Sequence, residues 1–349
     1  MNTPMNILVI GAGAIGGYLG GKLAARHNVT LYDRPRLVEV VRARGLRVIE
    51  PEGEFTARHL AAFTEPAELF AQTPRFDLAL CCVKAYDTVE ALEPLKPYAD
   101  RIDRWLTPQN GVDNEARLAL AFGREKIIAG TILNPISIPE TGTVRLEKRK
   151  GGIGVARVQD AEVNGLAAEL RESIGLPVRV YADYRSMKWS KLLLNLLGNA
   201  TSAILDMNTL EAFADRRVFA IEIAALREAV AVMNAERVRP VDLPGFPVRL
   251  LVFAVRALPA ALLQPVMHRL ARSGRGAKLP SLLIDLNAGR PRSEIDDLNG
   301  AVSRHGRSAG VATPVNDALT RVVQGLTSGA DDRSEWRRQI DRLVELTRA

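Results

Sequence analysis

The first half of the chain alternates short apolar runs with segments of helical periodicity. Five short apolar runs predict buried strands: residues 5–10, 28–33, 76–83, 104–107 and 126–133. Helical patterns fill intervals between them, at residues 14–26, 37–45 and 88–99. Because strands that alternate with helices are typical of a parallel sheet with right-handed crossovers, we predict an α/β fold with a doubly wound sheet.

The pattern changes near Asp183, and helical periodicity dominates from there to the end of the chain. Residues 218–236 predict a long amphipathic helix. Two later helices are expected to begin after the N-caps Ser293 and Thr313, the first of them ending at Gly310. We therefore expect two domains: residues 1–182 with the α/β fold, and residues 183–349 with an all-helical fold.

A glycine-rich segment, "VIGAGAIGGYLGG" (residues 9–21), follows the first predicted strand and opens the first helix. Gly11, Gly13 and Gly16 fit the pattern G-x-G-x-x-G, in which the glycines allow a tight turn, close approach of a pyrophosphate and close packing of helix on strand. The helix N-terminus offers N–H groups and a positive dipole end to the phosphates. The motif predicts a dinucleotide site formed by Gly11, Ala12, Gly13, Ala14, Ile15 and Gly16. The alternative is a glycine-rich turn without a ligand.

The residue that ends the second strand distinguishes the two nicotinamide dinucleotides. An acidic residue there holds the ribose 2′-hydroxyl of NAD, whereas a nearby Arg accommodates the 2′-phosphate of NADP. The chain has both, because Asp33 is followed by Arg34, with Arg36 close behind. The residues by themselves leave this choice open.

The segment "KWSKLLLNLLGNATS" (residues 188–202) contains a narrow polar line among leucines. If the segment is one helix, Lys191, Asn195, Asn199 and Ser202 fall within a stripe about 80° wide. Buried polar groups need partners, so one amine and two amides on a leucine-covered helix indicate a surface that faces a ligand. The alternative is a short polar face where two domains meet.

Four further polar residues are candidates, each with an ordinary structural alternative. Lys84 and Asn110 follow predicted strands, where open α/β sheets bind their ligands. Lys84 could equally extend its amine to solvent, and Asn110 precedes a glycine in a common turn pair. Glu294 and Ser281 stand at expected helix starts, which favour such residues without any function.

Composition excludes several other classes of protein. The net charge of +7 suits anionic small molecules, and its cations are scattered among acids, so we expect no nucleic-acid partner. The four histidines and two cysteines show no ligand spacing, and we expect neither a metal nor covalent catalysis. Two adjacent free thiols and no signal peptide indicate a cytoplasmic protein. The apolar residues 250–267 are interrupted by Arg256 and two prolines, so we expect no membrane span there but a possible homodimer interface.

Five segments together resemble ketopantoate reductases (2-dehydropantoate 2-reductases), in order and over nearly the whole chain: "NILVIGAGAIGG", "CVKAYDT", "PQNGV", "KWSKLLLNLLGNATSA" and "RSEIDDLNGAV…GVATPVN". The resemblance implies that residues 1–182 form an NADP-binding Rossmann domain and that residues 183–349 form a helical domain for substrate binding and dimerisation. It also implies NADPH as the hydride donor, which favours Arg34 over Asp33, and a role in pantothenate biosynthesis.

The resemblance also implies roles for the candidate residues. Lys191 matches the catalytic lysine that protonates the substrate carbonyl. Glu294 matches a second catalytic residue, a glutamate near that lysine and the nicotinamide ribose. Asn195 and Asn199 match residues that hold the substrate's hydroxyl and carbonyl groups, and Ser281 matches a contact to its carboxylate. Asn110 matches an amide that lies beside the nicotinamide and the lysine and binds both substrate and cofactor, and Lys84 lies near the adenosine phosphate end of NADP(H).

The chain departs from the family pattern around the expected substrate pocket. Lys278 and Pro280 replace an Asn and a Ser of the family, one extra residue precedes Glu294, and residues 238–275 are longer than expected. Two alternatives therefore stay open. One is an NAD(P)-dependent reductase of another branched 2-oxo acid, or an opine-type dehydrogenase. The other is a protein that senses NADP(H) without catalysis.

Overall fold

The computed structural model describes residues 3–159, 161–274 and 279–348. For residues 270–274 it describes the backbone alone. The chain forms two compact units. The first extends to Lys188 and includes Leu243–Phe246, and the second comprises Trp189–Asp242 and the residues from Pro247 onward. The division falls within a helix, close to the domain boundary expected from the sequence.

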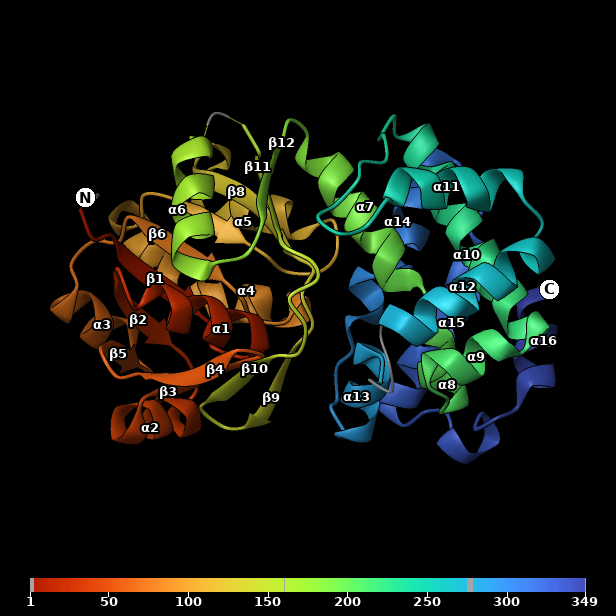
Figure 1. Cartoon of the computed structure of the whole chain (residues 1–349), viewed down its shortest axis with the longest axis horizontal. Helices are drawn as coiled ribbons and strands as arrows, with labels where there is room; N and C mark the ends of the chain where they lie inside the picture. Colours follow the sequence, from red (N-terminus) through yellow and green to blue (C-terminus); the bar gives the residue numbers. More distant parts are fainter. Residues whose placement is uncertain (1–2, 160, 275–278, 349) are drawn as a thin grey trace. The chain divides into compact units, whose positions relative to one another are not determined.

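The first unit is built on an eight-stranded sheet (Figure 1). Its strands are β1 (Asn6–Ile10), β2 (Asn28–Tyr32), β5 (Leu60–Phe63), β6 (Leu78–Cys81), β7 (Trp105–Thr107), β8 (Ile127–Ile132), β11 (Ile153–Arg157) and β12 (Val178–Tyr181). The order β5-β2-β1-β6-β7-β8 is parallel throughout, and β11 joins β8 in antiparallel orientation. In chain order these six strands read 3-2-1-4-5-6, the order of a dinucleotide-binding doubly wound sheet. The predicted fold class is thus confirmed.

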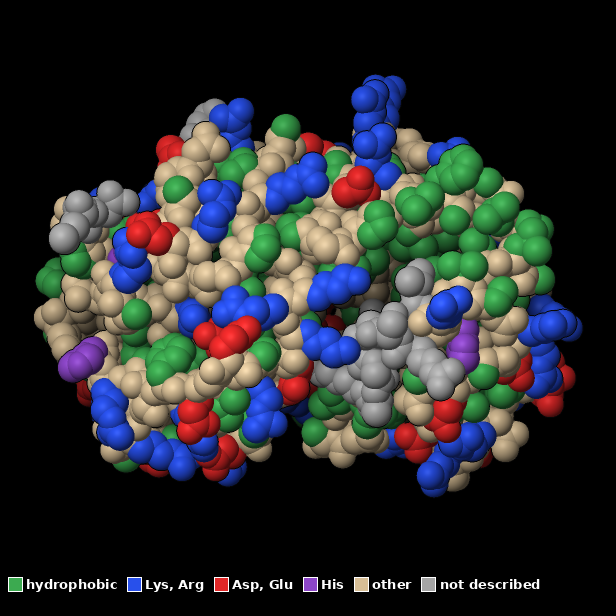
Figure 2. All heavy atoms as spheres, in the orientation of Figure 1, with side chains coloured by type: hydrophobic (Ala, Val, Ile, Leu, Met, Phe, Trp, Pro, Cys, Tyr) green, Lys and Arg blue, Asp and Glu red, His purple; other side chains and the backbone are tan. Residues whose placement is uncertain are grey.

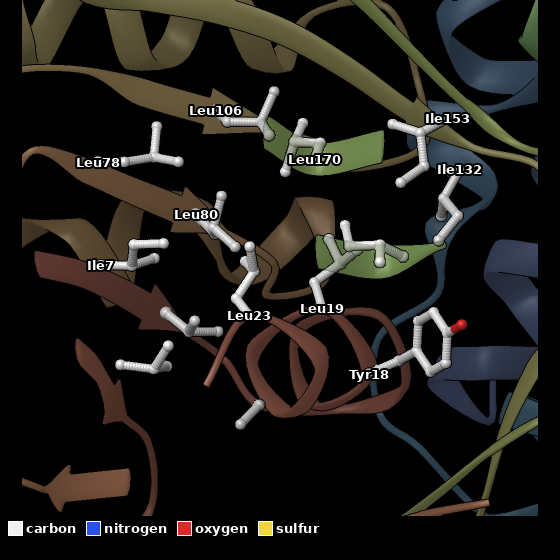
Figure 3. Packing of buried hydrophobic residues seen from close by; sticks show 14 of the residues in the cluster. Ile7, Tyr18, Leu19, Leu23, Leu78, Leu80, Leu106, Ile132, Ile153 and Leu170 are labelled. Carbon is white, nitrogen blue, oxygen red and sulfur yellow. The ribbon is translucent and has the colours of Figure 1, made fainter. Parts of the chain in front are cut away.

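Helices cover both faces of this sheet: α1 (Ala14–Leu23), α2 (Pro35–Arg44), α3 (Pro66–Gln72), α4 (Thr88–Leu92), α5 (Asn114–Phe122) and α6 (Asn164–Ile174). Short 3₁₀ turns connect them: η1 (Ala85–Asp87), η2 (Glu93–Arg101) and η3 (Arg124–Lys126). Alternate strand residues face opposite sides. In β1, Ile7 and Val9 enter the core with α1 and α6, and Leu8 and Ile10 enter the core with α3 and α5. Figure 3 shows the first of these cores, with Leu19 and Leu23 of α1 against the strands.

A second, four-stranded sheet, which the sequence did not predict, lies against α1. Its strands are β3 (Leu46–Glu50), β4 (Gly53–Ala57), β9 (Ile136–Glu140) and β10 (Thr143–Leu146), in the order β4-β3-β10-β9. A Cβ atom on Gly17 would come within 2.8 Å of Val144, and one on Gly21 within 2.5 Å of Val48. These two glycines therefore let the second sheet approach α1, in addition to the glycines that face the larger sheet.

The described residues of the second unit are helical. Its helices are α7 (Tyr184–Leu196, which begins in the first unit), α8 (Ala200–Leu205), α9 (Thr209–Ala214), α10 (Arg216–Ala235), α11 (Val248–Ala257), α12 (Ala260–Gly274), α13 (Ser281–Asn287), α14 (Asn299–Ala309), α15 (Pro314–Ser328) and α16 (Ile340–Arg348). Two 3₁₀ turns are η4 (Glu294–Asp297) and η5 (Arg333–Glu335). Gly310 ends α14 in a left-handed conformation, as predicted.

Three local predictions need correction. The expected continuous helix over residues 188–202 is broken between α7 and α8. The helix expected from Ser293 to Gly310 is divided into η4 and α14. The side chain of Thr313 does not cap α15; instead, the Glu228 carboxylate on α10 accepts hydrogen bonds from the amides of Val315 and Asn316, at 2.9 Å each.

Candidate active site

The glycine loop between β1 and α1 has the geometry of a phosphate cradle. Gly11 has φ +84°, and a Cβ there would lie 2.6 Å from Val83 Cγ1. A Cβ on Gly16 would overlap the Gly11 carbonyl oxygen. Gly13 differs, because its nearest neighbour would be Ile138 Cδ1 at 4.0 Å and no side chain caps α1. The space beside Gly13 and the adjacent helix N-terminus fit a dinucleotide pyrophosphate.

The carboxylate of Asp33 connects this loop to the end of β2. Its Oδ2 accepts a hydrogen bond from the Ala12 amide at 2.5 Å, and its Oδ1 accepts one from the Arg34 amide at 2.7 Å. Burial raises the pKa of Asp33, and these two amides oppose the rise. The Arg34 side chain is 84% exposed, and its guanidinium lies 3.4 Å from Asp87 Oδ2. The acidic group is thus engaged within the fold, and the cation is the group presented outward.

Gln109, which sequence reasoning missed, joins the carboxyl ends of several strands. Its Nε2 donates to the Val83 carbonyl and to Thr88 Oγ1, both at 2.8 Å, and its Oε1 accepts from Thr107 Oγ1 at 2.9 Å. Its backbone carbonyl accepts from Lys188 Nζ at 2.6 Å. The only signal in the sequence is its place before the Asn-Gly pair, because all its partners except Thr107 lie 21 or more residues away along the chain.

Two predicted site residues are direct neighbours in the chain of groups that Gln109 joins by hydrogen bonds: Asn110 follows Gln109 itself, and Lys84 follows Val83. Asn110 is half-buried, and its carbonyl accepts from Asn114 Nδ2 at 2.6 Å, while Gly111 takes φ +93° to turn the chain. Lys84, also half-buried, stands at the N-cap of η1. Both side chains therefore start at the carboxyl edge of the sheet, where this fold class binds ligands.

Helix α7 carries two lysines one turn apart in very different surroundings. Lys188 is 1% exposed and forms an ion pair with the fully buried Glu115 at 2.9 Å. Lys191 and Asn195 are half-buried in the second unit. Their four-residue spacing places them on one face of the helix.

The break after α7 changes the predicted polar stripe. Gly198 has φ +61°, and Glu222 on α10 accepts hydrogen bonds from its amide, at 2.7 Å, and from Thr201 Oγ1. Asn199 consequently becomes the N-cap residue of α8 rather than part of one long helix. The stripe prediction is wrong for Ser202, which is fully buried on α8, its Oγ without a hydrogen-bond partner among the described residues.

Asn199 and Ser281, two predicted substrate residues far apart in sequence, lie in contact within the second unit. Asn199 Nδ2 donates to Ser281 Oγ at 3.2 Å, and Asn199 Oδ1 accepts from the Leu282 amide at 3.1 Å. The side chain of Asn199 thereby serves the N-terminus of α13, which has no cap from Pro280. Lys278, predicted to differ from the family here, is outside the described residues.

Glu294 opens η4 and is 3% exposed. Ser293 precedes it, and its Oγ accepts a hydrogen bond from the Ile295 amide at 3.2 Å, so the predicted N-cap is found on a 3₁₀ turn. The predicted site residues divide between the two units. The first unit holds the glycine loop, Lys84 and Asn110, and the second holds Lys191, Asn195, Asn199, Ser281 and Glu294.

The described part of the chain holds no group of three or more His, Cys, Asp or Glu side chains arranged for a metal ion. No helix in that part has the length and apolar character needed to cross a membrane.

A doubly wound sheet with a glycine loop, followed by a helical unit, is typical of dinucleotide-dependent oxidoreductases. Two family models match the chain: "Ketopantoate reductase PanE/ApbA" over residues 7–159 and "Ketopantoate reductase PanE/ApbA C terminal" over residues 183–327. The chain belongs to the ketopantoate reductase family, and it is an oxidoreductase of the 2-dehydropantoate 2-reductase type.

Individual relatives agree with this assignment. The chain is 30% identical to the 2-dehydropantoate 2-reductase of Halobacterium salinarum, covering 92% of this chain and 98% of that one. It is 29% identical to that of Mesorhizobium japonicum, with the same coverage. A PanE/ApbA family ketopantoate reductase from Ralstonia eutropha JMP134 superposes with TM-score 0.77 and 28% identity, covering 93% of this chain and 99% of that one. A D-mandelate dehydrogenase with NADH and anilino(oxo)acetate shares the fold, with TM-score 0.76, 23% identity and coverage of 93% and 99%.

Proposed function

We propose that this protein reduces 2-dehydropantoate to pantoate with NADPH, and that Lys191 is the general acid. The observation that carries the assignment of the acid is the contrast between the two lysines of α7. The amine of Lys188 is enclosed by protein carbonyls and the Glu115 carboxylate, whereas Lys191 is partly accessible on the same face as Asn195. Lys191 is therefore the lysine of α7 that a substrate can reach.

Each side chain then has a defined task. NADPH, when bound, supplies a hydride to C2 of the 2-oxo acid. The Lys191 ammonium donates a proton to the carbonyl oxygen, so that the carbonyl becomes a hydroxyl and the amine regains its proton from water. Asn195, Asn199 and Ser281 bind the oxygen atoms of the substrate.

The remaining residues orient the cofactor. Asn110 and Glu294 hold the nicotinamide end, and Lys84 and Arg34 hold the adenosine phosphate end. The glycine loop, residues 11–16, receives the pyrophosphate. The open space beside Gly13 supports this assignment.

The first test is Lys191→Ala, assayed by NADPH consumption with 2-dehydropantoate. A positioned proton donor contributes roughly 10²- to 10⁴-fold to rate, so turnover should fall by that factor. NADPH affinity, measured by the cofactor's fluorescence, should stay within about twofold. Lys96→Ala, at an exposed lysine of the first unit, serves as the control. Equal turnover in Lys191→Ala and the parent would remove Lys191 from this role.

The preference for NADPH over NADH is assigned to Arg34. Both oxygens of Asp33 already accept backbone amides, whereas the Arg34 guanidinium is exposed beside the end of β2. Charge-assisted contacts to a phosphate are worth about 1.5–3 kcal/mol, so Arg34→Ala should lower kcat/KM with NADPH roughly tenfold or more and leave NADH unchanged. Arg58→Ala, at an exposed arginine after β4, is the control. An equal loss with both cofactors would contradict the assignment.

A panel of branched and aromatic 2-oxo acids, each with NADPH and NADH, tests the choice of substrate. Aromatic acids are included for two reasons. The chain departs from the family pattern at Lys278 and Pro280, and it shares its fold with a D-mandelate dehydrogenase. NADPH binding without oxidation in any of them would instead favour the sensing protein.

We also infer that the protein forms a homodimer through α11 and α12. Apolar side chains gather over α11 (Figure 2). Among the described side chains of α11 and α12, the large exposed apolar ones are Leu250, Phe253, Leu262 and Val266. Contiguous exposed apolar patches of this kind mark interaction sites in globular proteins.

A further inference from the structure

The buried pair of Lys188 and Glu115 has no part in the chemistry proposed above. Both residues nevertheless lie within a few positions of residues that do, Lys191 and Asn110. Lys188 Nζ donates to the Gln109 carbonyl at 2.6 Å and to the Gly130 carbonyl at 3.2 Å, and it faces Glu115 Oε1 at 2.9 Å. The three partners come from the loop after β7, from β8 and from the first turn of α5. One ammonium thus joins the start of α7 to three separate segments of the first unit.

Stability alone is a poor reason for this arrangement. Taking two charges out of water is costly, and well-packed apolar residues in place of a buried ion pair are often neutral or stabilising. The Lys188 ammonium does, however, require one geometry, because its hydrogen bonds to the Gln109 and Gly130 carbonyls have preferred lengths and directions. An apolar contact of the same size would allow α7 to slide or rotate.

The pair lies close along the chain to two residues of the proposed site, Asn110 and Lys191. Gln109 directly precedes Asn110, and Lys188 lies three residues before Lys191, which is about 4.5 Å along a helix. The backbone of Asn110 is held a second time, by the Asn114 side chain next to Glu115. The hydrogen bond from Lys188 to Gln109 therefore joins the backbone that carries Asn110 to the helix that carries Lys191.

We propose that Lys188 and Glu115 are positioning residues for the reduction: they hold the start of α7, at Lys188, in one orientation, and so set the direction in which the helix carries Lys191. The proposal rests on the proposed function, because it takes Lys191 to be the acid. The reacting groups of an enzyme tolerate little displacement, and a 1 Å misplacement can cost about 100-fold in rate.

Three variants test the proposal: Lys188→Met, Glu115→Leu, and the double variant. Each single change leaves one buried charge without its partner, so both should lower the melting temperature by several degrees. The double variant removes both charges and should recover most of that loss. In Lys188→Met and in the double variant, kcat should nevertheless stay roughly 10- to 100-fold below the parent. The KM for NADPH should stay within about twofold, because the glycine loop is untouched and the Asn110 carbonyl keeps its hydrogen bond from Asn114.

The separation of stability from turnover decides the outcome. A double variant in which kcat recovers together with the melting temperature, or one that fails to fold, would assign the pair to stability and overturn the proposal. Parent protein without turnover on any 2-oxo acid of the panel would overturn the proposed function and this inference with it. Full turnover in the parent and in Lys188→Met would overturn the inference alone.

Discussion

At the scale of single residues, the glycines of the first helix meet several different needs. Gly16 faces the backbone of its own loop, Gly17 and Gly21 face the second sheet, and Gly13 faces open space. The first three are needed for the fold whether or not a ligand binds. Gly13 is the position where a glycine serves something outside the protein chain.

This difference predicts opposite results for two alanine substitutions. Gly13→Ala should leave the melting temperature unchanged, since its φ of −68° suits any residue and a Cβ meets no close atom. It should weaken NADPH binding roughly tenfold, because overpacking costs about 1–3 kcal/mol. Gly16→Ala should lower the melting temperature, because its Cβ would overlap the Gly11 carbonyl oxygen. Thermal unfolding and fluorescence titration measure both, and unchanged NADPH affinity in Gly13→Ala would contradict a phosphate beside it.

At the scale of elements, the break between α7 and α8 determines where Asn199 lies. A single helix would have kept Asn199 on the face of Lys191 and Asn195. Gly198 ends α7, Glu222 holds the turn, and Asn199 turns to α13 and Ser281. The contact between the two predicted substrate residues therefore depends on one left-handed glycine.

Gly198→Ala should destabilise the second unit and lower turnover. A Cβ at φ +61° is strained, which costs about 1 kcal/mol or more, and it would also come within 2.5 Å of Thr209 Cγ2. Gly310→Ala is the matched control, since Gly310 has φ +67° but no atom within 4 Å of the added carbon. Melting curves should show the larger loss for Gly198→Ala, and equal losses would mean that the contact with Thr209 does not matter.

At the scale of the whole molecule, the exposed apolar face of α11 and α12 predicts an assembly of two chains. Light scattering coupled to size-exclusion chromatography should give twice the chain mass of 38.1 kDa for the parent. Phe253→Glu with Leu262→Glu should give the monomer mass, since the two side chains are 66% and 61% exposed and are expected to be covered by the partner.

The control for this prediction is Leu120→Glu, which changes an isolated leucine on α5 that is 91% exposed. This variant should keep the mass of the parent. A parent that elutes as a monomer of 38.1 kDa would reject the homodimer.

Local patterns sufficed for much of the fold but failed where distant segments meet. Strands β1, β2, β6 and β8 and the glycine loop follow from runs of apolar residues and from one motif. The helix cap supplied by Glu228, the role of Gln109 and the pair of Lys188 and Glu115 could not be predicted. In each of these, at least one partner is separated by many residues, and nothing in a short window of sequence identifies which polar group another will meet.

The sequence by itself determined the doubly wound α/β fold class, the nucleotide loop, the helical nature of the second half and the family. These features depend on periodicity and on short motifs with local physical requirements. Only the tertiary structure decided which of two neighbouring lysines is enclosed and which is accessible, and where the polar stripe breaks. Burial and hydrogen-bond partnership are properties of packed neighbours, and the neighbours of Lys188 are brought together by the sheet.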